Sequence, residues 1–339
     1  MTAITTTVNM SPAAPPVDNL GRRLLGSGRV MIGGAIVLLI ALACIASLPW
    51  TSDGGVGGTG AGTWYYDRQE AGGSRLPPDV SSVDRWFGTD VLGRSLLARC
   101  LFGGCISLAI GLAAAVISMV LGVGVGLLAG YRGGWTDAIL MRLVDILYGL
   151  PYILIIVLLK FALEPIVIDW LTALNLHVLP DRLKFPPAGA ANVITMFIAI
   201  GSVSWLTMAR VVRGQVLSLR NQPFIEAARA AGLTEMRIFG THLLPNLIGP
   251  VIVYATLTVP RAILEESLLS FLGVGVQPPV PTWGSLASDG IGLALNPVNS
   301  RWWLLLFPCS LLAVTLLALN FLGDGLRDVL DPKRGAARM

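Results

Sequence analysis

Six long, predominantly apolar stretches dominate the chain, and they restrict what it can fold into more than any other feature. A helix needs roughly 20 apolar residues to cross the hydrocarbon core of a bilayer. The stretches run from Val30 to Leu48, Gly103 to Gly130, Ile139 to Leu163, Ala191 to Met208, Leu247 to Leu272 and Trp302 to Leu322. In lipid, helices satisfy all of their backbone hydrogen bonds internally. The sequence therefore predicts an all-α polytopic membrane protein with six transmembrane helices.

The stretches between these spans give the expected domain organisation. Arg22, Arg23 and Arg29 precede the first span, and Lys and Arg flanking a span favour the cytoplasmic side. Both termini are therefore expected in the cytoplasm, and the net charge of +4 follows from this topology and not from nucleic-acid binding. We expect a disordered cytoplasmic tail at 1-29, a first transmembrane anchor helix at 30-48, an external segment at 49-102, a five-helix transmembrane core at 103-322 with a cytoplasmic loop at 210-246, and a cytoplasmic C-terminal tail at 323-339. Residues 164-189 read as an external insertion of unassigned role.

Residues 221-246 form a polar, small-residue segment between two spans, which cannot lie in lipid. Asn221 is a good N-cap, Pro223 suits a first turn, and Gly232 supplies a left-handed stop. Thr234 then caps a second short helix, which Pro245 is expected to end. The four alanines of the first helix leave a low surface that another protein could approach closely. The segment is therefore predicted to dock a partner at the membrane surface.

The order of residues in this segment resembles the EAA loop of ABC importer permeases. The matching residues are Glu226, Ala227, Ala228, Gly232, Leu244 and Pro245. In that family the loop is the coupling helix that fits a cleft in a cytoplasmic ATPase. Without the full spacing, an Ala-rich helix with a Gly stop would indicate only a stable helix and no particular function.

Two further stretches resemble signatures of the dipeptide, oligopeptide and nickel permeases. The first carries Gly88, Thr89, Asp90, Gly93 and Arg94. It departs from the family pattern at Ser95, where Asp is usual, and at Cys105, where Arg is common; Asp90 could equally cap a helix. The second, near the C-terminus, carries Asn320, Gly323, Asp324, Arg327 and Asp328.

Three charged residues interrupt the fifth span: Arg261, Glu265 and Glu266. A charge inside a span costs about 2.5 to 3.5 kcal/mol on insertion scales, so such residues face a pathway or each other. Arg261 and Glu265 are four residues apart and can pair. Two interpretations stay open: a pair that fixes helix packing, and a lining of the translocation pathway.

The resemblance implies a translocation subunit without catalysis of its own. No G-x-x-x-x-G-K-[ST] phosphate cradle occurs. The four cysteines form no CxxC pair, so no metal site is expected, and a Cys100 to Cys105 disulfide is disfavoured by their spacing. The family implies a heterodimer with a second homologous permease in a bacterial inner membrane, two ABC ATPase subunits that bind ATP and Mg, and an extracytoplasmic peptide-binding protein.

The resemblance gives an ATP-driven importer of di- or oligopeptides as the expected function. The nearest alternative is the same machine carrying nickel or glutathione. A proton-driven secondary transporter, with Glu265 and Glu266 as proton relays, is a second alternative, although no inverted repeat is visible. An intramembrane enzyme would need paired catalytic residues at one depth, and none is evident.

Overall fold

The computed structural model describes residues 20-52, 65-177 and 187-330. Five of its helices are long and apolar enough to cross a membrane: α2 (Gly28–Thr51), α3 (Leu96–Arg132), α6 (Pro187–Arg220), α9 (Leu244–Phe271, preceded by a π-turn at Phe239–Leu243) and α11 (Trp303–Leu330). The pair α4 (Gly134–Tyr148) and α5 (Tyr152–His177) gives a sixth if it counts as one span. The shorter elements are α1 (Leu20–Leu25), a 3-10 turn (Val83–Arg85), α7 (Pro223–Ala230), α8 (Glu235–Ile238) and α10 (Trp283–Ala294). The all-helical expectation is confirmed for the described residues.

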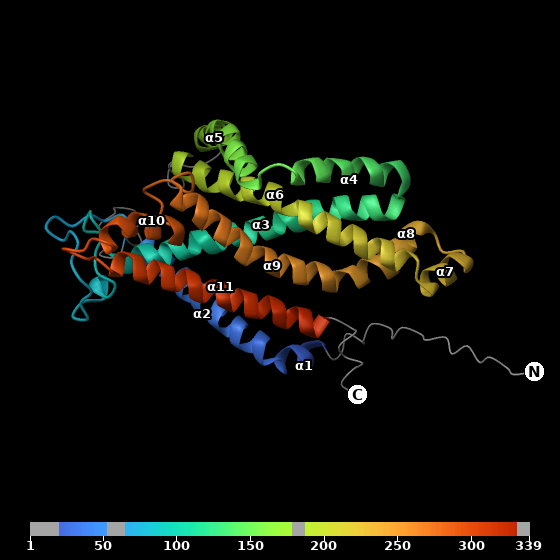
Figure 1. Cartoon of the computed structure of the whole chain (residues 1–339), viewed down its shortest axis with the longest axis horizontal. Coiled ribbons are helices and arrows are strands. Elements are labelled where there is room, and N and C mark those ends of the chain that lie inside the picture. Colours follow the sequence, from blue (N-terminus) through green and yellow to red (C-terminus); the bar gives the residue numbers. More distant parts are fainter. Residues whose placement is uncertain (1–19, 53–64, 178–186, 331–339) are drawn as a thin grey trace, which may run out of the picture.

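The long helices run side by side, and the short ones gather at the two ends of the bundle (Figure 1). Helices α7 and α8 stand at one end, which we call the α7 end. Helix α10 and the segment before α3 stand at the other, the α10 end. The polar segment predicted to dock a partner is therefore separated from the predicted external segment by the length of the bundle.

Helices α3 and α6 form the most extensive contact of the described bundle, and α3 turns a row of glycines toward α6. A Cβ on Gly126 would lie 2.6 Å from the carbonyl oxygen of Ala209, and one on Gly122 would lie 2.5 Å from Met208 Cβ. Gly130 packs in the same way against Val216. Because these glycines recur at every fourth residue, they lie on one face of α3 and allow the two backbones to approach closely.

The third predicted span is the largest departure from expectation. It is not one helix: α4 and α5 meet at Gly149–Leu150–Pro151 with a bend of 94°. A proline disfavours helical conformation in the residue before it, which accounts for a break here and not a mild kink. Helix α5 then continues through Pro165 to His177, so the loop expected at 164-189 is helical over its first half. The remainder, 178-186, lies outside the described residues.

Several element ends also differ from expectation. Helix α3 begins at Leu96, seven residues before the expected Gly103, and its N-cap is Ser95, not Asp90. Helix α11 continues to Leu330, through the start of the expected C-terminal tail. Part of the tail expected to be disordered is helical, as α1 and the start of α2, while residues 1-19 and 331-339 lie outside the described residues.

Candidate functional site

Helix α7 presents one face to the bundle and the other to solvent. Ile225 is fully buried and Ala228 nearly so, and both belong to one buried apolar cluster with Leu243 of the π-turn and Leu247 of α9. Glu226 and Ala227 are exposed. The low surface expected from four alanines is thus made by Ala227, Ala230 and Ala231, since Ala228 faces inward.

The ends of the short helices differ slightly from the sequence prediction. Gln222, not Asn221, is the N-cap of α7, and Gly232 has the expected positive φ of 79°. Pro245 does not end a helix. It lies in the first turn of α9, where a missing N–H costs little, and Leu244 begins that helix.

A polar contact ties this segment to the end of α3. The hydroxyl of Tyr131 donates to the Glu235 carboxylate, and Arg229 Nε donates to Glu235 Oε1 at 3.0 Å. The hydrogen bond from Tyr131 and then that from Arg229 lower the pKa of Glu235. The same carboxylate raises the pKa of Arg229. This link is not predictable from local sequence, because Tyr131 and Glu235 are 104 residues apart.

A pocket of about 380 Å³ lies between the α4–α5 bend, α6 and α9. Helix α9 contributes Tyr254, Thr258, Arg261 and Glu265, which repeat at helical spacing and so share one face. The other helices contribute mostly apolar and hydroxyl side chains, including Tyr148, Tyr152, Ser204 and Thr207. The pocket therefore combines apolar walls with a stripe of polar groups.

The structure brings Arg261 and Glu265 together and separates Glu266 from them. Arg261 Nε donates to Glu265 Oε1 at 3.0 Å, and the Arg261 side chain is 57% exposed against 10% for Glu265. Glu266 is fully buried on the face of α9 that packs against α3, where Ser270 Oγ donates to it at 2.6 Å and Ser107 Oγ, on α3, at 3.5 Å. The pair can thus act in the pocket, while Glu266 joins α9 to α3.

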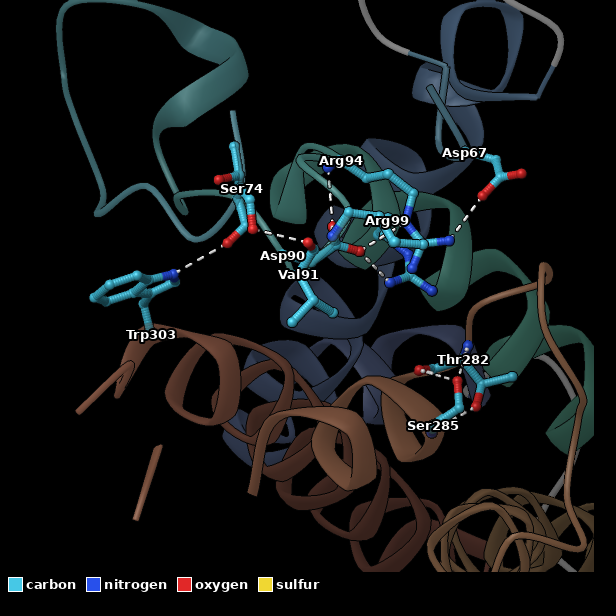
Figure 2. A network of polar contacts seen from close by, with 11 residues as sticks. Asp67, Ser74, Asp90, Val91, Arg94, Arg99, Thr282, Ser285 and Trp303 are labelled. Atoms are coloured by element: carbon cyan, nitrogen blue, oxygen red, sulfur yellow. Dashed lines mark hydrogen bonds and ion pairs between the residues drawn. The ribbon is translucent and has the colours of Figure 1, made fainter. Parts of the chain in front are cut away.

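At the α10 end, the residues of the first signature fold into one buried polar network (Figure 2). Asp90 Oδ2 accepts from Arg94 Nε and from Arg99 Nη1, both at 2.7 Å, and Arg94 also binds Asp67 at 2.8 Å. Burial acts to lower the pKa of Arg94, but the hydrogen bond to Asp67 and the charge of Asp90 outweigh it and raise that pKa. The network therefore fixes the segment before α3 onto the helix.

The glycines and threonine of this signature serve the same fold. Gly93 has a φ of 76°, and a Cβ there would lie 2.5 Å from the carbonyl oxygen of Glu70. Gly88 has the same φ and faces Leu76 and Trp303 just as closely. Thr89 Oγ1 accepts from the Leu76 amide at 2.8 Å. The signature residues, which were expected only from a family pattern, are thus each explained by backbone conformation, close packing or a hydrogen bond.

The C-terminal signature lies on α11 and divides between two roles. Gly323 and Gly325 are buried, and a Cβ on either would lie 2.7 Å from Leu257 on α9 or Val30 on α2, respectively. Asp328 accepts from Arg29 at 3.0 Å. The exposed members of the signature are Asn320, Asp324 and Arg327.

A bundle of long apolar helices, with a charged pocket inside it and a short exposed helix at one end, is the architecture expected of an integral-membrane transport subunit. A family model described as the binding-protein-dependent transport system inner membrane component matches residues 122–335. The chain belongs to that family, and it is a multi-pass protein of the inner membrane. The expectation of an importer permease is confirmed.

Curated relatives match over most of the chain. A dipeptide transport system permease protein, DppC, of Bacillus subtilis is 42% identical over 266 residues, which is 78% of this chain and 73% of the relative. An oligopeptide transport system permease protein, OppC, of Escherichia coli K12 is 40% identical over 312 residues, or 92% and 90% of the two chains. A solved structure of the MetNI methionine ABC transporter has a TM-score of 0.50 at 18% identity, covering 70% of this chain and 98% of that one. This last likeness concerns the fold.

Proposed function

We propose that this chain is a transmembrane subunit of an ATP-driven importer of di- or oligopeptides, and that α7 is its coupling helix. The observation that carries the proposal is the two-sided character of α7. Its inner face is fixed in the bundle by Ile225 and Ala228, while Glu226 and Ala227 stand in solvent. A rigid helix with a low outer surface suits insertion into a cleft of another protein.

Force applied to α7 would reach the pocket through α9. The buried side chains of α7 share an apolar cluster with Leu247 of α9. Helix α9 also carries Arg261 and Glu265, which lie about four to five turns beyond Leu247. The link between Glu235 and Tyr131 would carry the same movement to α3. ATP and Mg would be bound by two partner ATPase subunits. Binding and hydrolysis there would move α7 as a lever and switch the side of the membrane to which the pocket opens.

Peptide as the substrate is supported by the relatives, which are named for dipeptide and oligopeptide transport. The pocket suits such a solute in its chemistry, since it offers a cation, an anion and several hydroxyl groups. A second homologous permease would complete the pathway, and an extracytoplasmic binding protein would deliver the substrate. If the same machine imports nickel or glutathione instead, the binding protein should be found to carry that solute and not a peptide.

The test begins with affinity purification of the tagged chain from its native membrane, followed by mass spectrometry. Recovery of a second permease and ATPase subunits is expected. The purified complex in proteoliposomes should then take up peptide only with ATP. Recovery of the chain alone, active with a proton gradient, would contradict the proposal and favour a secondary transporter.

Two variants separate the role of α7 from general damage. Glu226→Ala and Ala227→Trp change exposed positions of α7 and should abolish uptake and release the ATPases, without loss of membrane insertion. Asp79→Ala, an exposed change at the opposite end of the bundle, is the matched control and should transport normally. Normal uptake by both α7 variants would show that another surface couples the chain to ATP.

A further inference from the structure

Lys160 is a buried cation on α5 that the transport machinery described so far does not use. Its side chain is almost fully enclosed, and its Nζ donates to the carbonyl oxygens of Val274 at 2.7 Å and Gly275 at 2.5 Å. A buried ammonium group is costly unless hydrogen bonds compensate for lost water, and ionisable residues inside membrane proteins mark functional positions by default. Both carbonyls belong to the segment that follows α9.

A second set of hydrogen bonds starts from α5 one turn further along the same face. Glu164 Oε1 accepts from Asn192 Nδ2 at 2.9 Å, and Asn192 Oδ1 accepts from the backbone amide of Gln277 at 3.0 Å. Lys160 holds the segment directly, and Glu164 holds it through Asn192 of α6. We call Lys160, Glu164 and Asn192, with the segment 274-277 that they hold, the α5 clasp.

The clasped segment is a rigid continuation of α9. The amides of Val274 and Gly275 both donate to the carbonyl oxygen of Leu269 at 2.9 Å. Gly275 lies so close to the helix that a Cβ would come within 2.4 Å of Ser270 Cα. Any movement of the segment would therefore be shared with α9, which lines the pocket.

The clasp lies over an apolar seal. Val276, beside Gly275, is 3% exposed and packs in one cluster with Ile156 of α5, Met196 of α6 and Leu269 of α9. The clasped segment begins beyond Phe271, about 10 Å along the helix axis from Glu265 toward the α10 end. The clasp therefore lies on the side of Glu265 that is remote from α7.

We propose that the α5 clasp is the closure of the transport pathway at the α10 end, with Lys160 as the residue that positions α5 on the end of α9. This inference rests on the proposed function. A lysine suits the task because its flexible stem and three donors can exchange backbone carbonyls for water as α5 moves away. Solute passes between α5 and α9 when the clasp is open, and the hydrogen bonds re-form when it closes.

The test uses the whole complex in proteoliposomes loaded with radiolabelled trialanine. Lys160→Met keeps an unbranched side chain that is one atom shorter, and it removes the donors. We expect ATP-independent efflux of trialanine to rise at least about tenfold, because the closed state loses both charge-assisted hydrogen bonds of Lys160. Thr172→Val, on the same helix, is the matched control, because that hydroxyl bonds only to the Ile168 carbonyl of its own helix.

The second set of hydrogen bonds supplies an independent readout. Glu164→Gln keeps an oxygen that can accept from Asn192, and it should behave as wild type. Glu164→Leu removes the acceptor at similar volume and should leak. This pair decides the question if Lys160→Met fails to assemble. Wild-type efflux from Lys160→Met and Glu164→Leu, with ATP-driven uptake intact, would overturn the closure. Absence of ATP-driven uptake in the wild type would instead contradict the proposed function.

Discussion

Asp90 Oδ2 lies 2.7 Å from Nη1 of Arg99, and both side chains are nearly buried, at 6% and 4% exposure. Asp90 precedes α3, whereas Arg99 lies in its first turns. The same oxygen also accepts from Arg94. One carboxylate thus balances two guanidinium groups at the α10 end, with Asp67 assisting at Arg94.

This arrangement predicts that Asp90→Asn is strongly destabilising. Removing one partner of a buried ion pair costs about 3–5 kcal/mol, because the opposite charge stays buried without compensation. Thermal unfolding of the detergent-solubilised protein, followed by tryptophan fluorescence, should show a large fall in Tm. Asp79→Asn is the control, since Asp79 is exposed and its carboxylate accepts from Ser81. Equal Tm values for the two variants would contradict a role of Asp90 in holding the segment before α3.

Gly126→Ala and Gly124→Ala should have opposite effects on stability. At Gly126 the new methyl group would meet Ala209 O at 2.6 Å and Val212 Cβ at 2.8 Å, so α3 and α6 must separate. Overpacking of this kind costs about 1–3 kcal/mol. At Gly124 nothing lies within 4 Å, and Ala should stabilise the helix by roughly 0.5–1 kcal/mol relative to Gly.

The measurement is the Tm of each glycine variant in the same detergent. Gly126→Ala should unfold below wild type and Gly124→Ala at or above it. If both substitutions lower Tm alike, the effect would come from the glycine backbone and not from contact between α3 and α6.

The features that could be predicted from sequence are those that depend on residues close together in the chain. The glycine row of α3, the positive φ at Gly232 and the pairing of Arg261 with Glu265 each follow from helical spacing or from the conformational freedom of one residue. The apolar stretches likewise located most of the long helices. These features need no knowledge of what packs against them.

Features that depend on partners distant in the chain were missed. Helical spacing would allow Asp145 to pair with Arg142, three residues before it, but its carboxylate accepts from Arg210, 65 residues along the chain. Lys160 lies inside the predicted third span, and its partners are identified only when the segment after α9 is placed beside it. Its only sequence signal was a lysine within an otherwise apolar stretch. Polar residues such as Glu164 predicted a loop from residue 164 onward, but α5 continues there because a partner on another helix satisfies the Glu164 side chain.

The two interpretations of Arg261 and Glu265 can be separated by exchanging them. Arg261→Leu leaves Glu265, which is largely buried, without its partner and should lower both Tm and uptake. The double variant Arg261→Glu with Glu265→Arg restores an ion pair of reversed polarity. If the pair only fixes helix packing, the double variant should recover both stability and transport.

A role in the pathway gives a different result for the exchange. Tm should return toward wild type while peptide uptake stays at least about tenfold lower, as expected when a transported solute meets charges of the wrong sign, a loss of roughly 1.4 kcal/mol. Because Arg261 is well exposed to the pocket, we expect this second outcome. Tm and uptake measured on the same preparations provide the comparison.

The link from Glu235 to Tyr131 and Arg229 predicts a pH dependence of local order near α7. The folded-state pKa of Glu235 lies below its ordinary value of 4.5, so ionised Glu235 stabilises the segment. That contribution is complete above pH 4.5 and is lost as the pH falls through the lower, folded-state pKa. Glu235→Gln should therefore loosen the segment at neutral pH and have no effect in acid.

Hydrogen exchange by mass spectrometry measures this directly on peptides covering 221-246. The ratio of exchange rates between Glu235→Gln and wild type at each pH cancels the intrinsic pH dependence of the chemistry. The ratio should exceed one at pH 7 and fall toward one below the folded-state pKa. Because the pair is exposed, 1 M salt should reduce the difference at pH 7. A ratio that stays constant across this range would place the order of the segment in the apolar contacts of Ile225 and not in Glu235.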